Sequence, residues 1–307
     1  MITGFKLFVD QVLSFGGFRI TEFPGKLYRE LLTALGTLRF GSVLMIPALI
    51  DFAKERPGYL SVDDTSNPKY GLAKYARTLY NTKTRGYRQG YKVVMFLWVL
   101  PNGQKFPIGF ALWYQGSGKL PAVALRGLSV LRNHFEDLKP LGMLGDGGYS
   151  KDELIKRLTD YGWPLVVRIA CDRTLDGKQV RQQIPRGYGV TEGKLENGVK
   201  LKVSRKQKHF LACNRMGWES EAIHTIYRLR WKIEEVFRAL KTCFGMDGCQ
   251  QHSMRAQANY LGICLILYTT LEIVSGGNVY SAWTNVISGS LQPENILPKI
   301  CLLYTSP

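Results

Sequence analysis

The order of strand-like and helix-like segments is the feature that most constrains the fold of this chain. Apolar patterns predict strands at residues 59–65, 91–100, 105–114, 141–145 and 163–169, and helices at residues 121–134 and 151–161. The turn Pro101-Asn102-Gly103-Gln104 joins two of these strands as an antiparallel hairpin. The later strands alternate with helices, as in parallel crossover connections. We therefore predict an α/β fold with a mixed sheet and helices on both of its faces.

The remaining segments divide the chain into regions. Helical apolar spacing near the start predicts an N-terminal helical region over residues 1–56. Short strand-like pieces, glycine turns and many basic residues predict a β-rich insertion over residues 170–216. The insertion separates the two parts of one domain, residues 57–169 and 217–275. An irregular tail is expected over residues 276–307.

A core helix is predicted at residues 254–274, near the end of the second domain part. Its longest apolar run, residues 261–271, is too short to span a bilayer, so no membrane partner is expected. The six cysteines are scattered without a Cys-x-x-Cys pair, and the four histidines are also spread out, so zinc is not expected. Free thiols and the lack of an N-terminal signal predict a cytoplasmic protein.

The charge of the chain is strongly unbalanced. It carries 41 Lys and Arg against 24 Asp and Glu, a formal net charge of +17. A soluble chain this basic usually meets a polyanion, most often nucleic acid. Residues 66–92 contain no acid, and their basic residues, with tyrosines between them, suit contact with phosphates and bases. The DNA-contact candidates there are Lys83, Arg85 and Arg88, and a solvated basic loop is the alternative.

A second pattern, in residues 226–241, predicts a helix with an unusual polar stripe. The segment has no Gly, Pro or Asn, and its apolar residues recur at helical spacing. Tyr227, Arg230, Glu234 and Lys241 fall within an arc of roughly 60° beside that apolar face. A carboxylate in such a stripe can hold a divalent metal while the cations grip phosphates. The alternative is a surface salt bridge between Arg230 and Glu234, four residues apart.

Acidic residues also stand at the ends of two predicted strands. Asp63 and Asp64 end the first, and Asp146 follows the strand at 141–145, with two glycines after it and Ser150 placed to cap the next helix. If these strands are neighbours, the acids converge with Glu234 and can bind two Mg²⁺ or Mn²⁺ ions. Such a site performs in-line displacement at phosphorus. Glycoside hydrolysis, which also uses paired carboxylates, would not need the positive charge.

The helix stripe resembles a family signature. Tyr227, two residues, Arg230, three residues, Glu234, six residues and Lys241 resemble the Tyr-Arg-Glu-Lys signature of DDE transposases of the insertion sequence four family. Gly145-Asp146-Gly147-Gly148-Tyr149 resembles that family's second Asp motif, and Val62-Asp63-Asp64-Thr65 its first. The resemblance covers roughly residues 59–274. It implies a ribonuclease-H-like catalytic domain that carries its β-rich insertion at the usual place.

The resemblance also implies roles for individual residues. Asp64, Asp146 and Glu234 would be the metal-binding catalytic residues. Asp63 is the alternative to Asp64, because either fits an Asp-x-Ser/Thr pattern, and we prefer Asp64. Arg230 and Lys241 would hold DNA phosphates, and Tyr227 would contact the DNA backbone. Phe210 would stack into the gap left by a flipped base, unless it belongs to the core.

The predicted function follows from the resemblance. The protein would be a bacterial, nucleoid-associated DDE transposase that uses two Mg²⁺ or Mn²⁺ ions. It would hydrolyse double-stranded DNA at insertion-sequence ends and join the freed 3′-OH to target DNA, as a homodimer when bound to DNA. Short flanks around the resembling region motivate one alternative, a catalytically silent or immobile DNA-binding remnant. A ribonuclease-H-like nuclease without end preference is the other.

Overall fold

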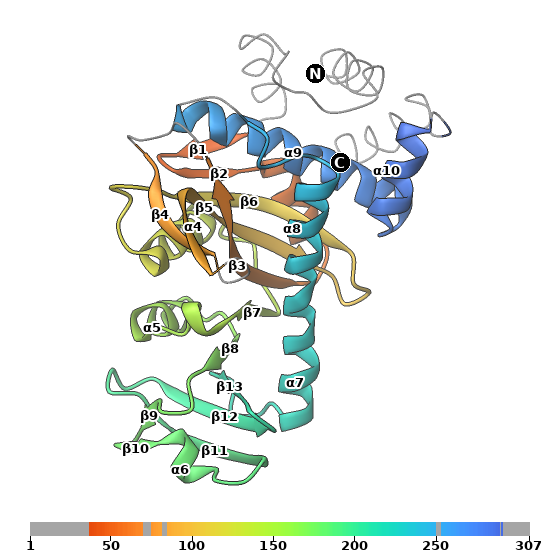
Figure 1. The fold of residues 1–307 in the computed structure, drawn as a ribbon. Helices are drawn as coiled ribbons and strands as arrows, with labels where there is room; N and C mark the ends of the chain where they lie inside the picture. Colours follow the sequence, from red (N-terminus) through yellow and green to blue (C-terminus); the bar gives the residue numbers. More distant parts are fainter. Residues whose placement is uncertain (1–36, 70–74, 82–84, 250–252, 289, 291–307) are drawn as a thin grey trace.

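A single large sheet forms the centre of the molecule. The computed structural model describes residues 37–69, 75–81, 85–249, 253–288 and 290. The sheet is 11-stranded with the order β1-β2-β6-β5-β3-β7-β8-β13-β12-β11, and β4 pairs with β5 outside this path (Figure 1). The strands are β1 (Leu38–Phe40), β2 (Val43–Met45), β3 (Tyr59–Pro68), β4 (Arg77–Asn81), β5 (Gly86–Val99), β6 (Lys105–Trp113), β7 (Gly142–Gly145), β8 (Leu165–Ile169), β11 (Tyr188–Lys194), β12 (Lys200–Lys206) and β13 (His209–Cys213). Strands β9 (Thr174–Leu175) and β10 (Lys178–Gln179) pair separately.

The sheet is mixed, as predicted. Strands β3, β7 and β8 are parallel neighbours, and the other adjacent pairs are antiparallel, including the predicted hairpin of β5 and β6. In the parallel register, Val62 of β3 lies opposite Gly145 of β7. The next residue along the chain is an aspartate in each case: Asp63, within β3, and Asp146, just after β7. The two acidic positions are therefore neighbours where β7 ends. The prediction that Asp63 and Asp64 end their strand is wrong, because β3 stays paired with β5 as far as Pro68.

Helices cover both faces of the sheet. They are α3 (Pro47–Lys54), α4 (Leu120–His134), α5 (Asp152–Asp160), α6 (Val180–Gln183), α7 (Ser220–Arg228), α8 (Lys232–Thr242), α9 (Met254–Ser275) and α10 (Val279–Ile287). Phe96 pairs with Val62 and shares its face, where Gly127 of α4 sits so close that a Cβ would stand 2.0 Å from the Phe96 ring. On the opposite face, the Ser61 hydroxyl donates to the Arg230 carbonyl oxygen at 3.5 Å. The predicted two-sided cover is confirmed.

The helix predicted at residues 226–241 is part of a longer helical rod. It begins with α7, tightens into a 3₁₀ turn, η3 (Leu229–Trp231), and continues as α8. Figure 1 shows α7 and α8 as one rod that runs from the insertion strands to the centre of the sheet. The apolar stripe of α8 is buried, including Ile233, Val236 and Leu240, so the predicted buried face is confirmed.

The predicted core helix is α9, which packs against β6 and α8. It is long and apolar enough to cross a membrane by length and composition, but 83% of its most apolar window is buried inside the molecule. The burial of Leu261, Ile263, Cys264 and Leu265 identifies it as a core element of this fold.

Two regional predictions need correction. Residues 38–45 are not helical, because buried Val43, Leu44 and Met45 pair as a strand with the edge of β6; residues 1–36 lie outside the described part. The insertion is β-rich as predicted, and its strands extend the main sheet, since β13 pairs with β8. The tail contains α10, whose Val279 and Ala282 are buried.

Ser150 does not cap α5. Its hydroxyl donates to the Gly147 carbonyl oxygen at 2.8 Å, and Lys151 occupies the cap position without a side-chain bond. The capping side chain in this loop belongs to Asp146, which begins the 3₁₀ turn η2 (Gly147–Tyr149) and accepts from the Gly148 N–H at 2.7 Å. The loop thus uses its hydroxyl to close the turn that holds Asp146.

Candidate active site

One face of β3 carries the polar contacts to the helical rod. Successive side chains of a strand point to opposite faces, so Ser61, Asp63 and Thr65 all face η3 and α8. Ser61 contacts the Arg230 backbone, Asp63 contacts the Arg230 side chain, and Thr65 accepts from the Lys241 ammonium at 2.7 Å. The alternation of the strand therefore selects which acid faces the helix.

Asp63 is the buried acid of this face. Its residue is 6% exposed. Its Oδ1 accepts from the Asp64 N–H at 2.8 Å, and its Oδ2 accepts from Nη1 of Arg230 at 2.5 Å. Burial and, second, the negative charge of Asp146 raise the pKa of Asp63 to about 7, although Arg230 acts in the opposite direction. Burial, more than the charge of Asp146, thus disfavours the charged form of this carboxyl group.

Glu234 lies one helical turn beyond Arg230. Its Oε1 is 3.9 Å from Nη1 of Arg230, and its side chain is 40% exposed. The same guanidinium nitrogen is much closer to Asp63, at 2.5 Å. Arg230 thus bridges a strand carboxylate and a helix carboxylate. An isolated surface salt bridge between Arg230 and Glu234 does not describe this arrangement.

The two other members of the stripe border the carboxylates. Lys241 donates to the Thr65 hydroxyl and, at 3.2 Å, to the Ser66 carbonyl oxygen. Tyr227 is half-buried, and burial raises the pKa of its phenol. The Arg230 guanidinium stands 5.8 Å from the centre of the Tyr227 ring. The rod therefore presents its predicted stripe toward the end of β3.

Asp64 points to the opposite side of the sheet. Its Oδ1 accepts from the Tyr149 hydroxyl at 2.9 Å, and its Oδ2 lies 2.7 Å from the Lys92 ammonium. Neither partner belongs to the helical rod. The geometry therefore favours Asp63, the alternative, over the preferred Asp64 as the acid that meets Asp146 and Glu234, because a strand sends consecutive side chains to opposite faces.

The other DNA-contact candidates lie apart. Phe210 is 3% exposed and packs in the core under the Arg205 guanidinium, so the core alternative describes it and it is not available for stacking on a base. Arg85 and Arg88 are exposed at the start of β5 and just before it. Lys83 lies outside the described residues.

One aromatic residue beside the carboxylates was missed. Trp231 is 55% exposed, and the Arg230 guanidinium stands 6.0 Å from its ring. The signal was present in the helical period, because residue 231 falls about 200° from both Leu229 and Ile233. An exposed indole next to a guanidinium is well suited to a nucleic-acid surface.

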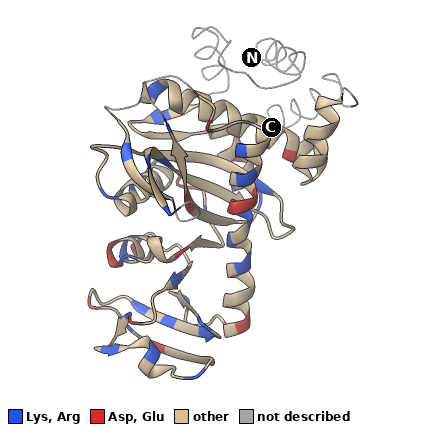
Figure 2. Ribbon diagram, in the orientation of Figure 1, with Lys and Arg blue, Asp and Glu red and all other residues tan. Residues whose placement is uncertain are grey.

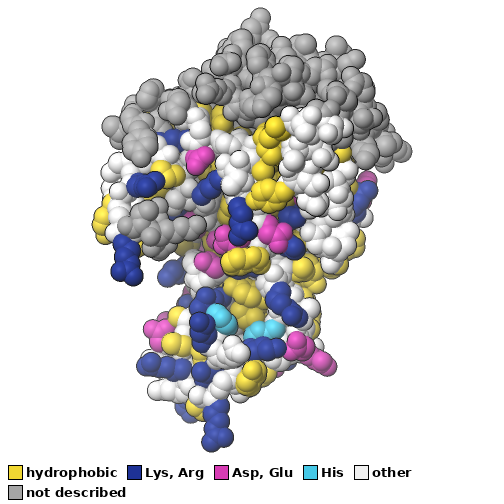
Figure 3. All heavy atoms as spheres, turned by 45° about the vertical axis from the view of Figure 1, so that its right-hand side comes forward, with side chains coloured by type: hydrophobic (Ala, Val, Ile, Leu, Met, Phe, Trp, Pro, Cys, Tyr) yellow, Lys and Arg dark blue, Asp and Glu magenta, His cyan; other side chains and the backbone are white. Residues whose placement is uncertain are grey.

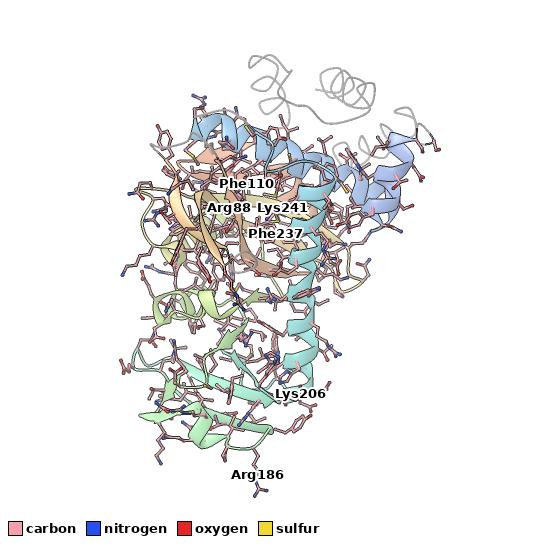
Figure 4. The ribbon with its side chains drawn as sticks, viewed as in Figure 1. Arg88, Phe110, Arg186, Lys206, Phe237 and Lys241 are labelled. Carbon is pink, nitrogen blue, oxygen red and sulfur yellow. The ribbon has the colours of Figure 1, made fainter. Side chains whose placement is uncertain are left out.

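Positive charge surrounds the acidic centre. Lys and Arg follow the rod, the β4–β5 hairpin and the insertion strands in Figure 2. Figure 3 shows acidic side chains gathered in the middle of one face, with basic side chains around them and over the insertion below. Figure 4 labels Lys241 on α8 and Arg88 on β5, and Arg186 and Lys206 at the far end of the molecule. Basic side chains are therefore present from β5 to the far end of the insertion.

The carboxylates around Arg230 are the candidate metal ligands of this face. Within the described ranges, no group of three or more His, Cys, Asp or Glu side chains is close enough to hold an ion. Hard carboxylate oxygens from Asp63, Asp146 and Glu234 nevertheless fit Mg²⁺ or Mn²⁺. In the DNA-free chain, the Arg230 guanidinium is the cation that contacts the Asp63 carboxylate.

Comparison with known proteins identifies the family. A family model described as a transposase DDE domain matches residues 55–270. This chain belongs to the transposase DDE family. Membership confirms the predicted class, the transposases that act in DNA transposition and recombination. The match spans the strand acids, the insertion and the helical rod.

A solved transposase structure shows the same fold. The piggyBac transposase synaptic complex with hairpin DNA is similar to this chain, with a TM-score of 0.50 and 11% identity, over 99% of this chain and 73% of that one. At this identity the similarity shows the fold alone, which is the predicted ribonuclease-H-like fold. A comparison with curated proteins gave no match.

Proposed function

We propose that this transposase is of the insertion sequence four type and that Asp63, Asp146 and Glu234 are its catalytic carboxylates. The observation that carries the proposal is the parallel register of β3 and β7, which makes Asp63 and Asp146 neighbours at one sheet edge. Arg230 links this edge to the helix that bears Glu234. The assignment replaces Asp64, whose side chain lies on the other face.

The three carboxylates would hold the divalent ions of the reaction. Two Mg²⁺ or Mn²⁺ ions bound there would activate water or a 3′-hydroxyl and stabilise the leaving oxygen in an in-line displacement at phosphorus. The chain contributes a buried Asp63, which excludes competing water from one ligand, and a half-exposed Glu234, which stays accessible to DNA. The reaction would be hydrolysis at the element ends and transfer of the 3′-OH into target DNA.

Arg230 would exchange partners during the reaction. In the DNA-free chain its guanidinium neutralises Asp63. A DNA phosphate would offer the same planar guanidinium a bidentate partner, and the Asp63 carboxylate would then be available to hold a divalent ion. Lys241, already held at the end of β3 by Thr65, would take a neighbouring phosphate.

The proposed partner is double-stranded DNA, at both transposon ends and the target. The net charge of +17 supports a polyanionic partner, and the structural neighbour is a transposase in a complex with hairpin DNA. Trp231 and the exposed Arg85 and Arg88 extend the contact surface. We propose that two copies meet on DNA and that the protein acts in the cytoplasm at the nucleoid.

Glu234→Gln tests the proposal. The substitution removes a charged ligand from a half-exposed position, so the fold and DNA affinity should be retained. The probe is a duplex that carries the terminal repeat flanking the gene. Mg²⁺-dependent cleavage of this duplex should disappear while binding, measured by electrophoretic mobility shift, stays unchanged. Cleavage by the Glu234→Gln variant would show that Glu234 is not a catalytic metal ligand.

The same experiment separates the two alternatives. A silent remnant would bind the duplex, but the unaltered chain would show no metal-stimulated cleavage. A ribonuclease-H-like nuclease would cut a scrambled duplex as fast as one that carries the terminal repeat. The transposase proposal requires cleavage at the repeat and joining of its 3′ end to a second duplex.

A further inference from the structure

The acid that does not face the helix has an unusual set of partners. Asp64 Oδ1 accepts from the Tyr149 hydroxyl at 2.9 Å, and Oδ2 lies 2.7 Å from the Lys92 ammonium. Asp64 lies in the middle of β3, Tyr149 in the turn after β7, and Lys92 in β5. One carboxylate thus ties together two adjoining strands and the turn that follows a third.

Tyr149 belongs to the turn that carries Asp146. The side chain of Asp146 begins this turn by accepting from the Gly148 N–H, and Tyr149 ends it with a ring that is 1% exposed. Gly145 leaves space for the ring, because a Cβ there would stand only 3.0 Å from the Tyr149 Cβ. The two ends of the turn are therefore fixed, one by its own backbone and the other by Asp64.

The hydrogen bond from Tyr149 to Asp64 links β3, which carries Asp63, to the turn that carries Asp146. Asp63 and Asp146 are like charges on neighbouring segments, and like charges repel most strongly where water is excluded. Each acid has a residue nearby that reaches to the other segment: Asp64 follows Asp63, and Tyr149 follows Asp146 by three positions. A hydrogen bond between Asp64 and Tyr149 opposes separation of the segments on the far side of the sheet.

We infer that Asp64 and Tyr149, supported by Lys92, are positioning residues that set the separation of Asp63 and Asp146. The inference rests on the proposed function and deepens it. Partners that orient metal ligands commonly change metal affinity or activity by roughly 10- to 100-fold when they are removed. Asp64 keeps a function under this assignment, although it does not bind the ions.

The molecule supplies a matched control for this bond. Tyr268 on α9 donates to Oε2 of Glu272 at 3.0 Å, and the Lys105 ammonium lies 3.4 Å from Glu272 Oε1. Tyr149 and Tyr268 are both 1% exposed. The two clusters have the same composition, Tyr–carboxylate–Lys. The first joins the segments that carry Asp63 and Asp146, whereas the second reaches only α8, through Lys105 and Glu235. Loss of the Tyr268 hydroxyl measures the structural cost alone.

The experiment compares Tyr149→Phe with Tyr268→Phe in the full chain. Mn²⁺ binding is followed by electron paramagnetic resonance in the presence of the terminal-repeat duplex, and DNA affinity and thermal midpoints are measured alongside. Tyr149→Phe should weaken Mn²⁺ binding roughly 10- to 100-fold, with DNA affinity unchanged. Tyr268→Phe should lower the thermal midpoint to a similar extent and leave Mn²⁺ binding at the wild-type value.

The possible outcomes are separable. Wild-type protein that binds Mn²⁺ and cleaves, with Tyr149→Phe titrating like Tyr268→Phe, overturns this inference alone. Wild-type protein that neither binds Mn²⁺ nor cleaves overturns the proposed function and the inference with it. If Tyr149→Phe does not fold, Asp64→Ala replaces it. That variant loses both the hydrogen bond with Tyr149 and the ion pair with Lys92, and it should weaken Mn²⁺ binding in the same direction; an unchanged titration overturns the inference.

Discussion

The middle of β3 and the first turn of α8 each present two consecutive acids, and the two elements orient their pairs differently. On the strand, Asp63 and Asp64 point to opposite faces of the sheet, so their partners share no residue. On the helix, Glu234 and Glu235 are separated by only about 100°. The strand divides its pair between two faces, whereas the helix leaves both acids on one flank of the rod.

The second helix acid belongs to a structural network. Glu235 pairs with Lys232 at 2.9 Å and with Lys105 at 3.5 Å, and Lys105 also meets the fully buried Glu272. Glu234, its neighbour, is left with Arg230 at 3.9 Å. The comparison teaches that the proposed catalytic member of each pair is the one that shares Arg230, and the other member stabilises the framework around it.

Substitution of Asp63 should have the largest effect on cleavage, and substitution of Asp64 a much smaller one. Asp63→Asn removes a proposed metal ligand and should lower the rate of cleavage by roughly 10³-fold or more. Asp64→Asn should cost far less, because the amide oxygen can still accept from Tyr149. Single-turnover cleavage of the terminal-repeat duplex at saturating Mg²⁺ measures both. Equal losses, or a larger loss for Asp64→Asn, would restore the original preference for Asp64.

The next largest effect concerns the stability supplied by the ion pairs of Glu272 and Glu235. Lys105→Met leaves Glu272 buried without its cation, and breaking a buried pair from one side costs about 3–5 kcal/mol. Lys232→Met removes a cation whose side chain is 33% exposed and should cost less than about 1 kcal/mol. Urea denaturation gives both values. Similar costs for the two lysines would show that the buried part of the network is not more important than its exposed part.

The comparison also explains what could be predicted from the sequence. Strand and helix periodicity located the sheet, the rod and the edge at which the acids meet, because these features depend on local patterns. The sequence pattern could not distinguish Asp63 from Asp64 as the metal ligand, because each fits the same short Asp-x-Ser/Thr pattern. That choice depends on which face of β3 the helix covers, which is set by packing between residues about 170 positions apart in the chain, such as Ser61 and Arg230.

Two other failures have the same origin. Phe210 matched a stacking role by its place in the insertion, but β13 joins β8 and buries its ring in the core. Residues 38–45 had helix-like spacing, but β2 pairs with the edge of β6, and β1 pairs with β2. In each case a sheet edge, which no local pattern reveals, decided the outcome. Residues whose role needs only helical spacing, such as Arg230 and Lys241, were placed correctly on one stripe.

A smaller effect is the pH dependence of stability that comes from Glu272, the buried carboxyl group of α9. Burial raises the pKa of Glu272, although Lys105 and Tyr268 act in the opposite direction. The folded protein therefore binds this proton more tightly than the unfolded chain. The contribution of Glu272 to stability is greatest below the ordinary glutamate pKa, given as 4.5, and is lost as the pH rises through the raised value.

Glu272→Gln removes this pH dependence. The free energy of unfolding of the wild type should fall relative to that of the variant as the pH rises from about 4 to about 8. Denaturation by urea across that range measures the difference. The opposite trend would mean that Lys105 and Tyr268 outweigh burial and lower the pKa of Glu272.

The smallest expected effect on stability is that of substituting Glu235. Glu235→Gln loses its ion pairs with Lys232 and Lys105, but its side chain is 34% exposed and Lys105 keeps Glu272, so the loss of stability should stay below about 1 kcal/mol. Cleavage should remain at the wild-type rate, in contrast to its abolition by Glu234→Gln. The two variants differ by one position on the same helix turn, so general damage to α8 would affect both. A loss of cleavage in Glu235→Gln would mean that the helix does not assign one glutamate to the reaction and the other to the framework.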